Sequence, residues 1–91
     1  MSTKTIIKPF SIKVYNNGFE YNFHGFAKSN NRPEIMMGYG SLNRSFYWRI
    51  YQHIGRATKV AEKVKKWYFS RGINYRVAVY DNINEKIVIE V

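Results

Sequence analysis

The residues best suited to chemistry in this chain are basic, and they concentrate in one short segment. Residues 55–72, GRATKVAEKVKKWYFSRG, contain six of the fifteen Lys and Arg residues and a single acidic residue, Glu62. Cations spaced three or four residues apart lie in one line along a helix, where they repel each other. Such a segment is either an ordinary solvated helix face or a surface that binds a polyanion, and we favour the polyanion.

A polynucleotide is the polyanion that best fits these residues. Lys and Arg side chains hold a phosphate backbone whatever its base sequence. Aromatic rings add a second signal, because each can stack on an unpaired base. The candidate binding residues are Arg49, Arg56, Lys59, Lys63, Lys66, Arg71 and Arg76 for phosphates, with Tyr47 and Tyr51 for bases.

Few residues of this chain are suited to catalysis. Two histidines, His24 and His53, could each serve as the proton shuttle of a small metal-independent ribonuclease, but a lone His on a strand is more often a surface residue. The six acidic residues are scattered, and there is no cysteine, so neither a metal site nor a thiolate nucleophile is indicated. We therefore expect a protein that is not an enzyme and that needs no cofactor or metal.

The net charge of +9 on 91 residues, with a pI of about 9.9, predicts attraction to anionic partners. Its distribution is uneven: residues 28–76 hold eleven basic and two acidic residues, whereas residues 77–91 hold one basic and three acidic residues. A basic tail would place the excess at one end of the chain. Positive charge concentrated in the middle of the chain indicates that the basic residues lie on folded structure and not on a flexible tail.

The first predicted structural element is a hairpin within residues 6–27. Its centre is Asn17-Gly18, the strongest short signal for a two-residue type I′ turn. Closing the turn there places Val14 opposite Tyr21. Strand alternation then predicts one apolar face and one wet face.

Farther from the turn, the same register pairs Ile12 with Phe23 and Phe10 with Gly25. The wet face of the whole sheet is expected to alternate aromatic and basic side chains, in a manner that suits single-stranded nucleic acid. These side chains are Lys13, Tyr15, His24, Tyr47, Arg49, Tyr51, Arg76 and Tyr80. The alternative is that tyrosine is simply a good strand former with a wet hydroxyl end.

The secondary structure of the middle of the chain is ambiguous. Residues 28–43 are polar and rich in Asn and Gly, which predicts a long loop with a short apolar patch at 35–37. Residues 44–54 alternate well as a strand but also fit a helical period. We choose the strand, because aromatic and β-branched residues are frequent there, and expect it to lie parallel to residues 74–80.

A helix is predicted over residues 56–71. Gly72 follows where helices commonly end. Six apolar positions share the face expected to pack on the sheet: Ala57, Val60, Ala61, Val64, Trp67 and Tyr68. A second hairpin follows, with Ile87, Ile89 and Val91 facing inward. The fold class predicted for the single domain 1–91 is α+β: a two-layer sandwich in which one helix covers an antiparallel-dominated sheet of four to five strands, in the order β-β-(β)-α-β-β.

We therefore expect a small, basic, non-enzymatic protein that binds DNA or RNA. Its many Asn, Lys, Ile and Tyr residues suggest an A/T-rich coding genome, such as that of a phage or another mobile element. The first alternative is a phage-type effector that binds and inhibits or redirects a host protein, and the second is the ribonuclease. The sequence has neither a signal peptide pattern nor an 18-residue apolar run, which predicts a cytoplasmic protein that does not associate with membranes.

Overall fold

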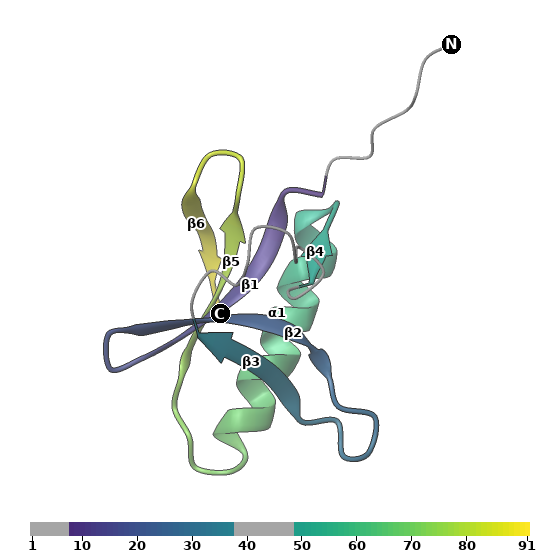
Figure 1. The fold of residues 1–91 in the computed structure, drawn as a ribbon, viewed down its shortest axis with the longest axis vertical. Helices are drawn as coiled ribbons and strands as arrows, with labels where there is room; N and C mark the ends of the chain where they lie inside the picture. Colours follow the sequence, from purple (N-terminus) through teal and green to yellow (C-terminus); the bar gives the residue numbers. More distant parts are fainter. Residues whose placement is uncertain (1–7, 38–48) are drawn as a thin grey trace.

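One helix packs on one face of a six-stranded antiparallel sheet in this computed structural model, which describes residues 8–37 and 49–91 (Figure 1). The elements in chain order are β1 (Phe10–Asn16), β2 (Phe19–Phe26), β3 (Pro33–Met37), β4 (Ile50–Tyr51), α1 (Ile54–Phe69), β5 (Arg76–Asp81) and β6 (Lys86–Glu90). The sheet order is β3-β2-β1-β5-β6, with β4 paired to β1. The predicted α+β two-layer architecture is therefore confirmed.

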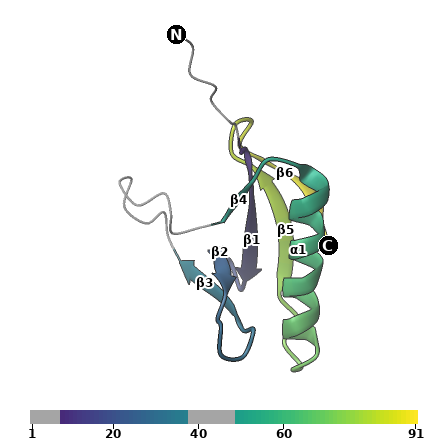
Figure 2. The same cartoon turned by 90° about the vertical axis from the view of Figure 1, so that its right-hand side faces the viewer.

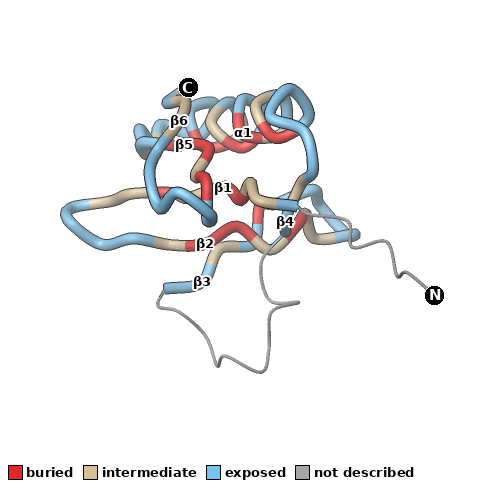
Figure 3. Tube along the Cα trace, turned by 90° about the horizontal axis from the view of Figure 1, so that it is seen from above, coloured by how far each residue is buried: buried red, intermediate tan, exposed pale blue. Residues whose placement is uncertain are grey.

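The core lies between α1 and the central strands (Figures 2 and 3). Its fully buried side chains come from β1, β2, α1 and β5: Ile12, Val14, Phe23, Ala57, Ala61, Val64, Val77 and Val79. Small residues on the helix let its backbone approach the sheet, while branched residues on the strands fill the space between the layers. Burial of this apolar surface is the main stabilising contribution that holds α1 in place.

The first hairpin forms about its predicted turn. Asn17 and Gly18 both have positive φ, 50° and 84°, as a type I′ turn requires, and Val14 pairs with Tyr21. The outer part of the predicted register is wrong, because Phe10 pairs with Tyr51 of β4 rather than with β2. Strand β4 thus occupies the position beside β1 that the sequence assigned to the end of β2.

Strand β3 corrects the prediction of a continuous loop over residues 28–43. It pairs with β2 and forms one edge of the sheet, which has six strands rather than four or five. Pro33 is its first residue, a position at which the missing N–H removes no essential hydrogen bond of the ladder. The Pro and the polar residues before it concealed a short edge strand.

The middle strand is shorter than predicted and is arranged differently. Only Ile50–Tyr51 is a strand within the described part of residues 44–54. β4 pairs antiparallel with β1, and β5 pairs antiparallel with β1 on its other side, so the predicted parallel pair between residues 44–54 and 74–80 is wrong. Tyr47 lies outside the described residues.

The helix starts and ends two residues earlier than predicted, at Ile54 and Phe69. Its buried residues, Ala57, Ala61, Val64 and Tyr68, are four of the six that the sequence assigned to the inward face. Gly72 has φ 77° and its N–H bonds to the carbonyl of Phe69, so the glycine closes the helix as expected. Within the described residues, no helix has the length and apolar character needed to cross a membrane.

The second hairpin is present, with one error in its predicted inward face. Ile89 and Val91 pack against the core, but Ile87 is 42% exposed. The β5–β6 register shifts between Val79 and Tyr80, so one extra residue of β6 enters the ladder and reverses the alternation beyond it.

Candidate nucleic-acid interface

Two pockets follow one another along the side of α1 that faces the β2–β3 hairpin. The first, here called the helix-start pocket, has a volume of about 320 Å³ and is lined by Phe23, Gly25, Phe26, Arg49, Tyr51, Arg56, Val60 and Lys63. The second, the helix-end pocket, has a volume of about 570 Å³ and is lined by Ala27, Ser29, Asn30, Arg32, Pro33, Glu34, Ile35, Trp67, Tyr68, Arg71, Ile73 and Tyr75. Together they are called the helix–hairpin groove.

Arg49 is held in the helix-start pocket by the backbone of β2. Its N–H bonds to the carbonyl of Phe23 at 2.9 Å, and its side-chain Nε donates to the carbonyl of His24 at 3.1 Å. The guanidinium lies over Gly25, where a β-carbon would be only 3.1 Å from Nε. A glycine with φ 137° at the β2–β3 register shift therefore provides the space that this cation occupies.

The start of α1 adds two more cations to this pocket. Arg56 and Lys63 both line it, and the ammonium of Lys63 lies 4.7 Å from the ring centroid of Phe26. The first turn of α1 contains no acidic residue, and the N-cap residue His53 makes no side-chain cap hydrogen bond. The positive end of the helix dipole therefore adds to the field of Arg56, which lies in this first turn.

Tyr51 forms part of the same pocket rather than of the open sheet face. Burial raises the pKa of its hydroxyl, while the charges of Arg49 and Arg56 lower it. Tyr51 packs against the core and Ile50 is 43% exposed, which is the reverse of the predicted alternation. Pairing of Tyr51 with Phe10 sets this phase, because a change of one residue in register moves every side chain to the other face.

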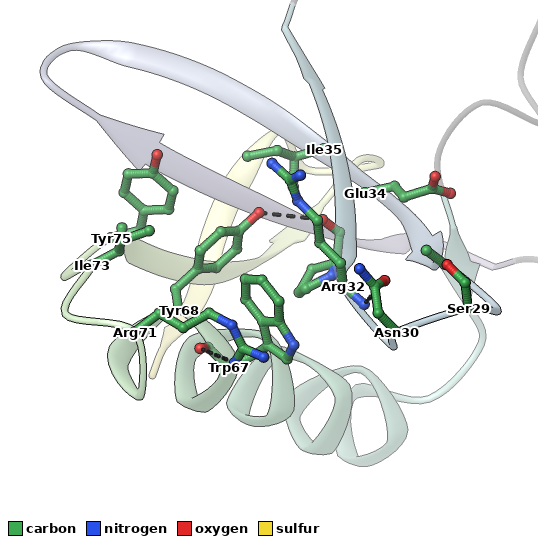
Figure 4. A pocket seen from close by; sticks show the side chains of 12 residues that line it. Ser29, Asn30, Arg32, Glu34, Ile35, Trp67, Tyr68, Arg71, Ile73 and Tyr75 are labelled. Atoms are coloured by element: carbon green, nitrogen blue, oxygen red, sulfur yellow. Dashed lines mark hydrogen bonds between the residues drawn. The ribbon is translucent and has the colours of Figure 1, made fainter.

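The helix-end pocket is aromatic on its helical wall (Figure 4). The guanidinium carbon of Arg71 lies 3.6 Å from the ring centroid of Trp67, and the ring of Tyr68 meets that of Trp67 edge to face. Tyr68 also packs against Tyr75, with their ring centroids 4.7 Å apart. Arg32 and Asn30 line the opposite wall, which belongs to the β2–β3 turn and β3.

Lys59 and Lys66 line neither pocket, but both are exposed on α1 beside the groove. At three- and four-residue spacing they continue the row of Arg56 and Lys63 along the helix. The predicted row of cations is therefore present on one element, with Arg71 just past its end.

No carboxylate among the described residues forms a salt bridge with these cations. The described residues form two salt bridges, Lys13 with Glu20 and Arg76 with Glu90, and neither involves a cation of α1 or of the groove. Glu34 is the acidic residue among the groove-lining side chains. The groove and the adjoining row on α1 therefore have a net positive charge.

The open face of the sheet is different, although it bears several of the expected aromatic and basic residues. Arg76 donates two hydrogen bonds to the Glu90 carboxylate, at 2.7 and 3.0 Å, and its guanidinium lies over Tyr15 at 5.5 Å. Lys13 pairs with Glu20 and lies 4.3 Å from the ring centroid of Tyr80. The cations of this face are thus neutralised within the protein.

Tyr15 on that face is half-buried and lies beside the Arg76 guanidinium. Burial, assisted by the charge of Glu20, raises the pKa of its hydroxyl to about 12. Its ring is covered by the Arg76 guanidinium. The Glu90 carboxylate holds that guanidinium with two hydrogen bonds, so its charge is already neutralised.

The structure therefore divides the predicted site residues. It brings Arg49, Tyr51, Arg56 and Lys63 together in one pocket, places Arg71 in the next, and sets Lys59 and Lys66 beside them. Arg76 lies on the opposite face of the sheet, because Val77 and Val79 point to the core and the alternation of β5 turns Arg76 away.

Among the groove residues that were not predicted as site residues are Trp67, Arg32 and Phe26. Trp67 was assigned to the core by its helical phase, although its ring also forms the wall of a pocket. Arg32 and Phe26 reach the groove only because the β2–β3 hairpin folds beside α1, more than thirty residues away in sequence. Only the basic character of Arg32 could have indicated it, and that signal is weak.

The two histidines occupy unrelated elements. His24 lies on β2, where burial lowers the pKa of its imidazole despite the opposing charge of Glu34. His53 is exposed at the start of α1. Among the described residues, no group of three or more His, Cys, Asp or Glu side chains could hold a metal ion.

No protein-family model, curated protein or solved structure matches this chain.

Proposed function

We propose that this protein binds nucleic acid, without catalysing a reaction on it, through the helix–hairpin groove and the adjoining face of α1. The observation that supports the proposal most strongly is a contrast between the open sheet face and the side of the protein that bears α1 and the groove. The two differ in whether their basic side chains form salt bridges. Cations of the open sheet face pair with carboxylates, whereas those of α1 and the groove do not. Unpaired cations in a row repel one another, and a phosphate backbone would relieve that repulsion.

The groove suggests a division of roles among these residues. Arg49, Arg56 and Lys63 line one pocket, and Arg56 lies in the first turn of α1, so phosphates bind at the helix-start pocket. Lys59 and Lys66 extend the contact along α1, over a rise of about 10 Å for seven residues. Such contacts hold the backbone without reading sequence, so affinity is expected to be general and strongly dependent on salt.

The test is a double charge reversal with a matched control. Lys59→Glu with Lys63→Glu changes the net charge by the same amount as Lys8→Glu with Lys86→Glu, and Lys8 and Lys86 are exposed residues that line neither pocket. Binding to fluorescent DNA and RNA is measured by anisotropy over a salt series. We expect the affinity of the α1 variant to fall by at least about 10-fold. The slope of log affinity against log salt concentration should become shallower by the equivalent of about two phosphate contacts.

The control reversal should weaken binding much less, because it acts only through the net charge. Equal losses in both variants would show that binding depends on overall charge and not on this surface. If the protein binds no polynucleotide at low salt, but a protein partner withstands both nuclease and high salt in a pull-down, the proposal is wrong.

A further inference from the structure

We infer that the helix-end pocket accepts the base of an unpaired nucleotide, so that the ligand of the helix–hairpin groove is single-stranded. This inference rests on the proposed function and adds to it the form of nucleic acid that binds. The pocket volume of about 570 Å³ lies within the range of sites that enclose small organic ligands. A base in a duplex is stacked and paired, and must leave the helix before it can enter such a site.

The ring system of Trp67 provides the stacking surface. Trp67 is partly exposed, and its indole forms a wall of the pocket together with Tyr68 and Tyr75 (Figure 4). The guanidinium of Arg71 lies at van der Waals distance from the Trp67 ring. Unpaired bases stack both on aromatic rings and on guanidinium planes, so this pair offers either surface to one base.

Two cations flank the space that the base would fill. Arg71 is at the end of α1, and Arg32 extends from the hairpin on the opposite wall. A ligand that fits here combines a flat ring with an adjacent anionic group. A nucleotide has both, whereas an apolar peptide side chain would leave the two guanidinium groups unused.

The walls of the pocket are fixed by hydrogen bonds before any ligand arrives. The Tyr68 hydroxyl donates to the carbonyl of Pro33 at 3.3 Å, which joins α1 to β3. Lys65 donates to the carbonyl of Tyr75 at 2.6 Å, and the N–H of Ala27 donates to the carbonyl of Arg32 at 2.8 Å. A preformed pocket lowers the ordering cost of binding.

The position of the pocket fits a strand that runs along α1. Trp67 of the helix-end pocket lies one helical turn beyond Lys63 of the helix-start pocket, which places these two residues about 6 Å apart along the helix axis. A base in the helix-end pocket therefore leads its neighbouring phosphates toward Lys63, Arg56 and Arg49.

The experiment compares three ligands of equal length: a single-stranded 12-mer, the same strand with every base removed, and the duplex. Anisotropy of a labelled strand gives affinity, and emission of Trp67 in a Trp48→Phe background reports the pocket directly. We expect quenching of Trp67 by the single strand, and affinity about 5- to 150-fold weaker for the abasic strand. The duplex should also bind more weakly than the single strand.

The matched variants are Trp67→Leu and Phe69→Leu, with thermal unfolding as the check on folding. Phe69 is an aromatic residue of the same helix, 65% exposed, that lines neither pocket. Trp67→Leu should remove most of the difference in affinity between the strand with bases and the abasic strand. Phe69→Leu should change neither.

Several results would overturn the inference. Equal affinity for the normal and abasic strands would contradict it, yet would leave the proposed function intact if binding remained salt-dependent and sensitive to the Lys59 and Lys63 reversal. Tighter binding of the duplex than of the single strand would likewise contradict the inference and leave the proposed function intact. A mononucleotide that binds as tightly as the 12-mer would show that the ligand is a free nucleotide and not a strand. Failure of all three ligands to bind at low salt would overturn both proposals.

Discussion

The guanidinium of Arg49 lies against the backbone of Gly25, where a β-carbon would be 3.1 Å from Nε, so that the side chain would have to shift. Two hydrogen bonds from Arg49 to the carbonyls of Phe23 and His24 fix this arrangement. The same glycine lies where β2 changes its register with β3. One residue therefore both bends the hairpin and places a cation in the helix-start pocket.

Gly25→Ala is expected to destabilise the protein and weaken binding. The positive φ of 137° is strained for any residue with a side chain, which costs about 1 to 3 kcal/mol, and the added methyl would displace Arg49. Urea denaturation gives the stability change, and anisotropy with a labelled oligonucleotide gives the loss of affinity, expected to be several-fold.

Gly55→Ala provides the control for that substitution. Gly55 is inside α1, its φ is not in the left-handed region, and an added β-carbon would contact nothing within 4 Å. Alanine there should stabilise the protein by about 0.5 to 1 kcal/mol and leave binding unchanged. A Gly25→Ala protein as stable as Gly55→Ala would contradict the strain and the close approach of Arg49.

Tyr68→Phe tests the link between the helix and the hairpin. The Tyr68 ring is 4% exposed, and its hydroxyl donates to the carbonyl of Pro33. Removing the hydroxyl leaves that carbonyl without this donor, and we expect a loss of about 1 kcal/mol in the free energy of unfolding. Denaturation in urea measures the loss, and an unchanged midpoint would show that the bond does not stabilise the fold.

Local signals predicted the parts of the fold that local chemistry determines. Asn17-Gly18 located the first turn, and the apolar period of residues 57–68 located the helix. Strand β3 was missed because its pairing with β2 and its edge position are not visible in its own residues. The parallel pair was wrong because only the complete sheet shows that β1 lies between β4 and β5.

The candidate site was predictable to the same degree. The cations of α1 could be placed on one line from their spacing alone, which needs no tertiary information. The pocket could not be predicted, since it arises where Arg32 and Pro33 of the hairpin approach Trp67 and Tyr68 of the helix. The neutralisation of Arg76 by Glu90 likewise depends on the pairing of β5 with β6.

Stability should decrease as the pH falls below about 4.5, and Asp81 is a main cause. Hydrogen bonds from the side chain and backbone of Asn84 hold the pKa of the Asp81 carboxyl below its ordinary value of 3.8. A carboxyl with a lowered pKa in the folded state stabilises the fold above its unfolded pKa, and this contribution is lost as the pH falls through the folded value. Glu90, whose pKa is lowered from 4.5 by Arg76, acts in the same direction.

Asp81→Ala isolates the contribution of that carboxylate. The variant should be less stable than the natural protein at pH 7, because the N–H groups of Ile83 and Asn84 lose their acceptor. The difference in Tm should narrow between pH 5 and pH 2, as the natural protein loses the same interaction by protonation. A difference that stays constant over this range would show that Asp81 stabilises the turn without its charge.

Arg76→Gln distinguishes the two faces of the sheet. Arg76 is exposed and paired with Glu90 on the face opposite α1, so its charge is already neutralised. We expect the Tm to change by less than about 4 °C, because exposed ion pairs contribute little to stability. Affinity for labelled single-stranded DNA should stay within about 2-fold, whereas Arg56→Gln, which removes the same charge from the groove, should cost several-fold and flatten the salt dependence. If Arg76→Gln weakened binding as much as Arg56→Gln, the open sheet face would have to belong to the binding surface, and a single strand would have to contact both layers of the protein.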